Sequence, residues 1–431
     1  MGRAHVASRS FVGWVAVAAA LAFGVAGSAA QPAQRSGAVT IAMLVNASQK
    51  PGYDLLIPNF ERVYPNIRVN VTYTASNADT YQLETTQLAA GNAPELLSTS
   101  PGCGTPIAVC TLAKAGFLAP MVKKPWARRS VPLVTSSEKY GQGLFAFAPL
   151  LSPFGVFTND DRFKQLGLKV PQTFAQLLRV CQKAKDAGTV ALLLPGGSVA
   201  FVTFLIVDLA VVTVYGKDRH FTEELKAGKV TFEGTPGWHQ ALQKFIDMND
   251  GGCFEAGVAG AGPASVFPRF AQGQGLMLPS PSSNKGSIDV ANPQFALSHH
   301  PFPGGTDPKQ TRTYLGLGGA LSVNAHSSAQ NQATAQTFID FIARPKQNAL
   351  YATTQGGLTQ YEFLKGQIPG FMSDFAAVFK EHRYVVNPVQ GWWNANVLLA
   401  LQQNQIGLIT GQRSIDDVLK AMDAAWKLGP A

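Results

Sequence analysis

The chain has 431 residues, of which 46% are hydrophobic and 14% are charged. This composition allows large cores to be buried and excludes a disordered chain. The length exceeds what one hydrophobic core usually organises, and it therefore predicts two lobes. The net charge of +9 is spread thinly along the chain. Its one local concentration lies around Trp126, with Lys123, Lys124, Arg128 and Arg129. No stripe of aromatic residues and arginines continues it, so we expect a solvated basic loop and no nucleic-acid partner.

The first thirty residues have the pattern of a removable export signal. Arg3 and Arg9 precede an uncharged apolar run from Phe11 to Val25, and small residues end at Ala30, before Gln31. A membrane anchor would need about 20 apolar residues, and this run is shorter. We therefore expect a cleaved signal peptide, Met1 to Ala30. Because no cysteine follows the run, we expect a soluble periplasmic protein and not a lipoprotein.

From residue 39 onward, β-rich runs alternate with helical patterns, which is typical of an α/β fold with mainly parallel sheets. In the first part of the chain we expect three strands and two helices: strands 39–45, 67–73 and 96–98, and helices 55–63 and 80–90. The segment 144–159 carries Pro149 and Pro153, which cannot donate to a ladder. It therefore favours a crossing between lobes over a central strand.

The second part continues the alternation. A capping box of Thr173 and Gln176 predicts the start of a helix, and the nearly all-apolar segment 199–215 predicts a buried core helix. Glycines within the expected strand 315–323 suggest a second hinge. The remaining elements are expected as strands 190–194 and 275–278 and helices 331–343, 371–380, 393–409 and one beginning at Ser414.

Four cysteines follow the signal peptide, an even number in an oxidising compartment. Cys103 and Cys110 can close a small loop, and Cys181 and Cys253 each lie in or after a predicted helix of one lobe. We predict both pairs as structural disulfides. Neither pair has the spacing of a zinc site, so no metal is expected.

A search for catalytic motifs finds little. The sequence contains no nucleophile elbow, zinc-protease motif, phosphate loop or calcium loop. Glu84 and Glu95 could form the carboxylate pair of a glycoside hydrolase, but each has a structural alternative: Glu84 on a solvated helix face and Glu95 in a turn. We therefore expect no catalysis and no cofactor.

Polar and aromatic residues instead follow the predicted strands, where open α/β sheets form their clefts. Hydroxyls and amides bind the rims of sugars, and aromatic rings cover their apolar faces. The candidates from this pattern are Asn46, Ser48, Ser76, Asn77, Ser98 to Ser100, Ser152, Ser280 to Ser283, Trp392 and Trp393.

The order of segments resembles the extracellular solute-binding proteins of ABC importers, a family that includes maltose-binding and glycerol-3-phosphate-binding proteins. The resemblance covers nearly the whole mature chain, and its carriers are the motifs at 91–95 (GNAPE), 156–168 (VFTNDDRFKQLGL), 171–174 (PQTF), 270–273 (FAQG), 301–305, 318–319, 338–345 (FIDFIARP) and 411–426. It implies a two-lobed periplasmic-binding-protein fold with a hinge of several crossings and a cleft between the lobes. Lobe I would comprise residues 31–151 and 317–345, and lobe II residues 152–316 and 346–431.

The resemblance also implies a function. A monomer would close on a small ligand and be recognised by the membrane permease subunits of an ABC transporter. Comparison around the family's motifs places seven residues at or next to its ligand positions: Asn77, Ser100, Ser152, Phe201, Ser282, Gly319 and Trp393. The segment 387–391 lacks the arginine that glycerol-phosphate binders use, so a neutral carbohydrate is favoured. Glycerol-3-phosphate or another small polar solute, and a secreted glycoside hydrolase, remain the alternatives.

Overall fold

The computed structural model describes residues 38–121 and 123–430. The predicted signal peptide lies outside these residues. The described residues fold as one compact unit that contains two main sheets.

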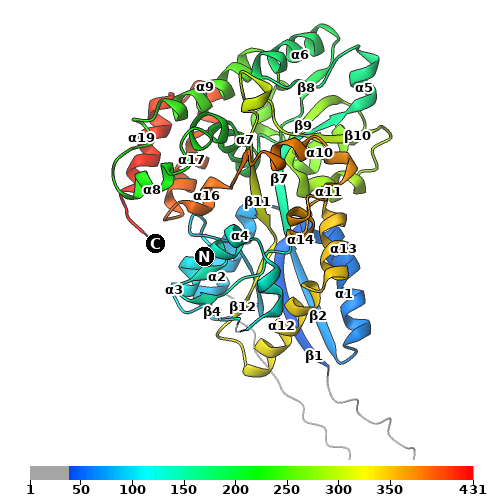
Figure 1. Ribbon diagram of the computed structural model, residues 1–431, viewed down its shortest axis with the longest axis vertical. Helices are drawn as coiled ribbons and strands as arrows, with labels where there is room; N and C mark the ends of the chain where they lie inside the picture. The colour runs from blue at the N-terminus through cyan, green and yellow to red at the C-terminus, as the bar shows by residue number, and fades with distance from the viewer. Residues whose placement is uncertain (1–37, 122, 431) are drawn as a thin grey trace, which may run out of the picture. The chain divides into compact units, whose positions relative to one another are not determined.

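The first sheet has five strands in the order β2-β1-β3-β12-β4. Its apolar strand faces are covered on one side by α1, α12 and α13 and on the other by α2 (Figure 1). Strand β1 pairs in parallel with β2 and with the central strand β3, while β12 returns antiparallel to β3. The bounds are β1 Val39–Asn46, α1 Lys50–Val63, β2 Ile67–Thr74, α2 Asn77–Ala90, β3 Leu96–Thr99, α3 Val109–Lys114, β4 Leu118–Ala119, α4 Pro132–Ser137, β12 Ala320–Asn324, α12 Ala329–Ile342 and α13 Pro345–Gln355. The strands and helices expected over residues 39–98 are confirmed. The strands are within one residue of their predicted bounds, whereas α1 begins five residues and α2 three residues earlier than expected.

The second sheet runs β13-β11-β7-β9-β8, with β10 paired to β7 beside this path. Its strands are β7 Leu150–Asn159, β8 Val190–Leu192, β9 Gly275–Pro281, β10 Leu297–His300, β11 Thr313–Gly318 and β13 Tyr384–Val386. Its larger helices are α5 Asp160–Gln165, α6 Phe174–Asp186, α7 Val199–Ala210, α8 Phe221–Lys226, α9 Pro236–Asp250, α10 Pro263–Ala271, α11 Lys285–Val290, α17 Asn396–Asn404 and α19 Ile415–Trp426. Shorter elements complete the described chain: β5 Lys139–Tyr140, β6 Gly143–Leu144, α14 Gln360–Leu364, α15 Phe375–Lys380, α16 Pro388–Gly391, α18 Gly407–Thr410, the π-helix Val211–Tyr215 and six single-turn 3-10 helices.

Strand β7 both joins the two sheets and lies inside the second. Leu150 packs in the core of the first sheet, whereas Phe154 packs in the core of the second, so the segment crosses as expected. The expectation that it is not a central strand is wrong, because β7 pairs with β9, β10 and β11. The ladder to β9 begins only at Phe154, so Pro153 has a neighbouring strand on the β11 side alone and its missing N–H is tolerated.

The segment predicted as one strand over 315–323 changes sheets in its middle. Gly318 ends β11 in the second sheet, and Ala320 begins β12 in the first. Gly319 between them has φ +64°, and a Cβ there would lie 2.8 Å from Oε1 of Gln49 and 2.9 Å from the hydroxyl of Tyr351. Glycine is therefore required at this crossing, where the sequence placed a second hinge.

Helix α13 belongs to the packing of the first sheet. Tyr351 and Ala352 are fully buried in the core that contains Ile41 and Phe60. This packing continues the first sheet's core beyond residue 345, where the sequence placed the boundary of lobe I. The chain therefore leaves this core only after α13.

The apolar segment 199–215 forms α7 and the π-helix that follows it, and nearly all of it is buried. The prediction of a buried core helix is confirmed. It contains Asp208, which is fully buried beside Tyr314, and burial raises the pKa of this carboxyl well above its usual range. None of the helices described over 38–121 and 123–430 is long and apolar enough to cross a membrane.

Two helix starts test the capping predictions. Ser414 and Asp417 form a reciprocal capping box at α19. At α6, Thr173 accepts from the backbone N–H of Gln176 at 3.3 Å, as expected. The side chain of Gln176 binds the backbone N–H of Gln172 instead of Thr173, so this second half of the predicted box is wrong.

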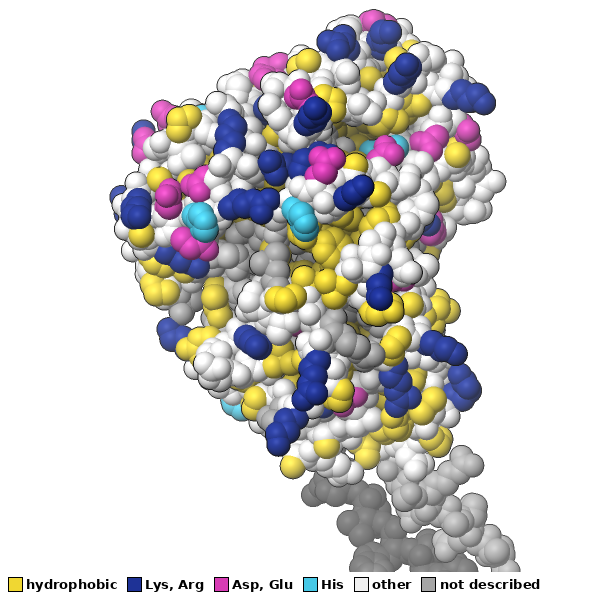
Figure 2. All heavy atoms as spheres, viewed as in Figure 1, with side chains coloured by type: hydrophobic (Ala, Val, Ile, Leu, Met, Phe, Trp, Pro, Cys, Tyr) yellow, Lys and Arg dark blue, Asp and Glu magenta, His cyan; other side chains and the backbone are white. Residues whose placement is uncertain are grey.

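The basic segment around Trp126 is only partly a solvated loop. Trp126 is buried, and its Nε1 donates to Asp340 at 2.9 Å, while Nζ of Lys124 lies 2.8 Å from the same carboxylate. Packing of the indole therefore anchors the segment on α12. On the face seen in Figure 2, lysine and arginine side chains are scattered and form no continuous stripe.

Candidate functional site

A cavity of about 770 Å³ lies where loops and helices of both sheets meet. From the first sheet it receives the residues that follow β1 and β3 and the start of α2. From the second it receives one face of α7, the start of α10, the residues around α11, and α16. Strands β7 and β11, which join the sheets, form part of its wall. The cavity therefore has the position that strand-end loops of open α/β sheets give to a binding cleft.

Six of the residues predicted for the site line this cavity: Asn46, Asn77, Ser100, Ser152, Phe201 and Gly319. Ser48, Ser76 and Ser98, from the same strand-end pattern, line it as well. The sequence pattern thus located the first-sheet side of the cavity correctly. Their role in ligand binding stays a prediction.

Local structure orients the two asparagines. Asn46 ends β1, and its Oδ1 accepts from the backbone N–H of Ser48 at 2.8 Å, which leaves its amide NH₂ as a donor. Ser76 caps α2 by accepting from the backbone N–H of Asp79 at 3.1 Å. The cap directs Asn77, the first residue of the helix, to the cavity wall, where its amide is half-buried.

Ser152 contacts the cavity, whereas Ser280 and Ser282 lie behind its wall. Oγ of Ser152 accepts from the backbone N–H of Ser283 at 2.9 Å and lies 3.3 Å from Oγ of Ser282. Ser280 and Ser282 are fully buried, and Oγ of Ser280 accepts from Asn284 at 2.8 Å. The prediction that these two serines face the cleft is wrong, because their hydroxyls are used to fix the turn after β9.

The tryptophan pair is also placed outside the cavity lining. Trp392 is fully buried, and its Nε1 lies 3.2 Å from the hydroxyl of Tyr215. Trp393 stacks on Trp426, with ring centroids 4.4 Å apart, and donates to its carbonyl at 3.0 Å. Both indoles therefore pack against aromatic rings of the second core. The expectation that they bind ligand is therefore corrected, and the nearby residues Val389 and Gln390 line the cavity instead.

The two carboxylates considered for catalysis serve different parts of the first sheet. Glu84 is fully buried, so the expectation that it lies on a solvated helix face is wrong. It accepts a hydrogen bond from the backbone N–H of Ser98 at 2.9 Å, and burial raises its pKa. Glu95 accepts from the backbone N–H of Ala42 at 2.8 Å and from Asn331 at 2.9 Å. Neither lines the cavity. Each carboxylate satisfies backbone donors, which is a structural role.

Sequence reasoning missed several residues of the lining. Phe204 and Val207 follow Phe201 at helical spacing on α7, a signal that could have been read from the sequence. Gln355 could not be predicted in this way, because it ends helix α13 and does not follow a strand. It is 2% exposed, and neither polar atom of its amide has a hydrogen-bond partner in the described structure. This amide therefore keeps its hydrogen-bonding capacity free.

The described lining contains no aspartate, glutamate, lysine, arginine or histidine. Its polar groups are hydroxyls, amides and three tyrosines, Tyr81, Tyr314 and Tyr351. No group of three histidine, cysteine, aspartate or glutamate residues with the geometry of a metal site is found within residues 38–121 and 123–430. The cavity can therefore donate and accept hydrogen bonds but offers a charged ligand no counter-ion.

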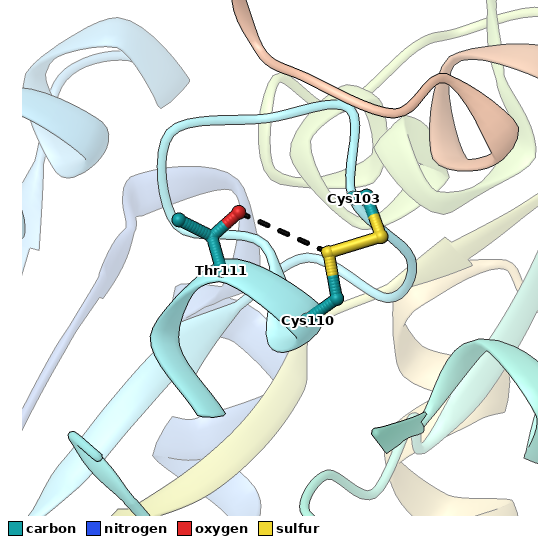
Figure 3. Close-up of a disulfide and its surroundings, with 3 residues drawn as sticks. All are labelled: Cys103, Cys110 and Thr111. Carbon is teal, nitrogen blue, oxygen red and sulfur yellow. Dashed lines mark hydrogen bonds between the residues drawn. A yellow bond between two sulfur atoms is a disulfide. The ribbon is translucent and has the colours of Figure 1, made fainter. Parts of the chain in front are cut away.

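The disulfide Cys103–Cys110 closes a loop at the edge of the cavity (Figure 3). Within this loop Thr105 and Ile107 line the cavity. The backbone N–H of Cys103 donates to the carbonyl of Gln390 at 3.1 Å, so the loop contacts α16 of the second sheet. A Cβ at Gly104 would lie 1.7 Å from the carbonyl oxygen of Val389, so only glycine permits this approach. The second predicted disulfide, Cys181–Cys253, is also confirmed and ties α6 to the segment after α9.

Comparison with known proteins identifies the family. The sequence model described as "Bacterial extracellular solute-binding protein" matches residues 46–349, which is well over half of the chain. The chain belongs to this family. The family consists of exported binding proteins, not enzymes.

Similar proteins agree with this family. The Multiple sugar-binding protein of Streptococcus mutans is 22% identical to this solute-binding protein over 306 residues, which is 70% of each chain. A structure titled as RafE in complex with raffinose has a TM-score of 0.71 at 21% identity, covering 90% of this chain and 99% of that one. A protein of xylan utilization from Caldanaerobius polysaccharolyticus has a TM-score of 0.76 at 18% identity, with the same coverages. A sugar transporter from Bacillus licheniformis in complex with stachyose has a TM-score of 0.72 at 17% identity, covering 91% and 100%. The predicted two-lobed α/β fold is thereby confirmed.

Proposed function

We propose that this solute-binding protein is the substrate-binding subunit of an ABC importer and captures a neutral mono- or oligosaccharide. The observation that carries the proposal is the cavity between the two sheets, lined by amides, hydroxyls and aromatic rings and by no charged side chain. Its volume of about 770 Å³ lies within the usual range for small-molecule sites. The relatives named for raffinose, stachyose and multiple sugars support the ligand class.

The lining argues against glycerol-3-phosphate, the first alternative. A phosphate dianion needs cations or an array of N–H donors, and the described lining has no lysine, arginine or histidine. Asn387, Val389 and Gln390 line the cavity in the segment where glycerol-phosphate binders keep an arginine. The absence of a guanidinium from this segment therefore favours an uncharged solute.

The placement of the carboxylates argues against a glycoside hydrolase, the second alternative. Hydrolysis needs two carboxyl groups on either side of the scissile bond. Glu84 and Glu95 instead bind backbone N–H groups of the first sheet, outside the cavity lining. The protein accordingly binds and releases its ligand unchanged.

The cellular part of the proposal rests on sequence. A signal peptide that ends at Ala30 would deliver a soluble, monomeric, non-lipidated protein to the periplasm. There the two lobes would close on the ligand and present the closed form to the permease subunits. Amino-terminal sequencing of the exported protein is expected to begin at or near Gln31, and an intact Met1 would contradict this route.

A ligand screen tests the binding function. Because ligand binding is linked to folding, a bound sugar raises the melting temperature. We expect stabilisation by uncharged saccharides and none by glycerol-3-phosphate at the same concentration. Stabilisation only by phosphorylated or cationic compounds would contradict the proposal, and turnover of a glycoside would establish the hydrolase instead.

A matched pair of variants locates the site. Asn77 lines the cavity, whereas Asn70 on β2 is exposed and does not. We expect Asn77→Ala to weaken binding of the stabilising sugar by roughly tenfold, the value of one hydrogen bond, and Asn70→Ala to leave it unchanged. Isothermal titration calorimetry measures both, and equal effects would show that binding occurs elsewhere.

A further inference from the structure

The cavity has two chemically different walls. The wall from the first sheet carries hydroxyls and amides: Asn46, Ser48, Gln49, Ser76, Asn77, Ser98 and Ser100. The wall from α7 and α10 is dominated by apolar side chains: Val199, Ala200, Phe201, Phe204, Val207, Pro263, Ala264, Phe267 and Pro268. A ligand that contacts both walls therefore meets hydrogen-bonding groups on one side and a hydrocarbon surface on the other.

Three phenylalanines form the centre of the apolar wall. The ring centroids of Phe201 and Phe204 lie 5.9 Å apart at 67°, and those of Phe201 and Phe267 lie 5.8 Å apart at 72°. Both are edge-to-face arrangements, which hold the rings in defined orientations. Phe201 and Phe267 are 8% and 7% exposed, while Phe204 is half-buried. The wall is thus preformed, and Phe204 is the most exposed of its three phenylalanines.

The polar side chain within this face of α7 is already engaged. The hydroxyl of Thr203 lies 2.8 Å from the carbonyl of Val199 and 3.0 Å from Oε1 of Gln405. Nε2 of Gln405 donates to the same Val199 carbonyl at 2.7 Å. A sugar hydroxyl placed against the rings of Phe201, Phe204 and Phe267 would lose its water without gaining a partner, which is unfavourable.

Unpaired polar atoms lie instead on other parts of the lining. Both amide atoms of Gln355 and Oε1 of Gln390 are buried without a hydrogen-bond partner in the described structure. These groups belong to α13 and α16, not to the phenylalanine wall. The polar part and the apolar part of a ligand therefore have separate places in one cavity.

We propose that the natural ligand is an uncharged glycoside with an apolar substituent, an alkyl or aryl group. Its sugar binds the amides and hydroxyls, and its apolar group lies on Phe201, Phe204 and Phe267. The proposal rests on the carbohydrate-binding function proposed above and narrows it to one class of carbohydrate. Neither wall offers a counter-ion, so the substituent carries no charge.

Matched glycosides test the proposal. Methyl and hexyl glycosides of glucose, galactose, mannose and xylose, each as both anomers, are titrated into the full protein by calorimetry, with 1-hexanol as the aglycone control. Each buried methylene strengthens binding by about fourfold, so burial of two of the five extra methylenes gives more than tenfold. We expect at least one hexyl glycoside to bind more than tenfold tighter than its methyl partner and 1-hexanol to bind far more weakly.

The possible outcomes separate the two proposals. Methyl and hexyl glycosides of equal affinity would overturn the apolar substituent and leave the carbohydrate function intact. Binding of 1-hexanol as tight as that of any hexyl glycoside would overturn both, because the sugar would contribute nothing. Binding of none of these glycosides would overturn the apolar substituent, and the saccharide screen described above would then decide the carbohydrate function.

Two variants assign the effect to the wall. Phe204→Ala removes a half-buried ring from the cavity, and Phe117→Ala removes a half-buried ring outside it. We expect Phe204→Ala to reduce the hexyl-to-methyl affinity ratio at least fivefold. Phe117→Ala is expected to leave the ratio unchanged. An unchanged ratio in Phe204→Ala would place the alkyl group elsewhere and overturn the assignment.

Discussion

We expect one disulfide to contribute mainly to the free energy of unfolding and the other to ligand affinity. Removing them one at a time separates these contributions. Cys181 and Cys253 are 72 residues apart, both fully buried, in the core of the second sheet. Cys103 and Cys110 are 7 residues apart, at the edge of the cavity. Each pair is replaced by alanines in a separate variant, and each variant is measured for unfolding and for sugar binding.

The magnitudes follow from loop closure in the unfolded chain. A cross-link removes more conformational entropy from the unfolded state when it closes a longer loop. With a separation of 72 residues, the loss of Cys181–Cys253 costs about 4.4 kcal/mol in unfolding free energy. With a separation of 7, the loss of Cys103–Cys110 costs about 2.5 kcal/mol. The buried pair also leaves a cavity, which adds to the larger cost.

Ligand affinity is expected in the opposite order. The loop closed by Cys103–Cys110 supplies Thr105 and Ile107 to the cavity and contacts Gln390 across it. Freeing this loop means that ligand binding must order it again, which weakens affinity. Removal of Cys181–Cys253 leaves the lining in place and is expected to leave affinity unchanged in the folded protein.

Urea unfolding and calorimetric titration of the same samples provide the test. Reduced wild-type protein, which keeps all four sulfur atoms, controls for the cavity left by alanine. Equal losses of stability from the two variants would refute the loop-closure reasoning. A loss of affinity in the Cys181–Cys253 variant alone would refute the assignment of the small loop to the site.

Three further predictions concern single residues. Burial raises the pKa of Glu138 from 4.5 to about 8, so between these pH values the folded state holds a proton that the unfolded state releases. The free energy of unfolding therefore falls as pH rises from about 4.5 to 8. Glu138→Gln is expected to flatten this dependence. Burial lowers the pKa of His299 from 6.5 to about 3, so between these pH values the unfolded state binds a proton that the folded state does not. The free energy of unfolding therefore falls as pH drops through this interval. His299→Gln is expected to reduce this acid sensitivity, which urea titrations at several pH values measure. A Cβ at Gly104 would collide with the carbonyl of Val389, so Gly104→Ala forces the loop and α16 apart and is expected to weaken sugar binding at least tenfold. Gly260→Ala, where a Cβ meets nothing within 4 Å, is the control, and equal binding by the two variants would contradict the role of this contact.

Much of the fold could be predicted from the sequence because its signals are local. The alternation of β-rich runs and amphipathic helices predicts strands and helices near their observed bounds over residues 39–98. Strand ends in an α/β fold point to one edge, so the order of segments alone assigns the polar residues after β1 and β3 to a cleft. One cysteine pair followed from its short spacing and the other from its placement in and after helices of one lobe, and both are confirmed.

The sequence by itself determined the fold class and the first-sheet wall of the cavity, since periodicity, caps and strand ends are properties of neighbouring residues. Only the tertiary structure decided which side chains face the cavity on the second-sheet side. Trp392 and Ser280 carry suitable chemistry but are drawn into the core and the turn after β9, whereas Gln355 reaches the cavity from a helix that packs on the first sheet. Burial and exposure depend on contacts between segments far apart in the chain, and no local pattern specifies them.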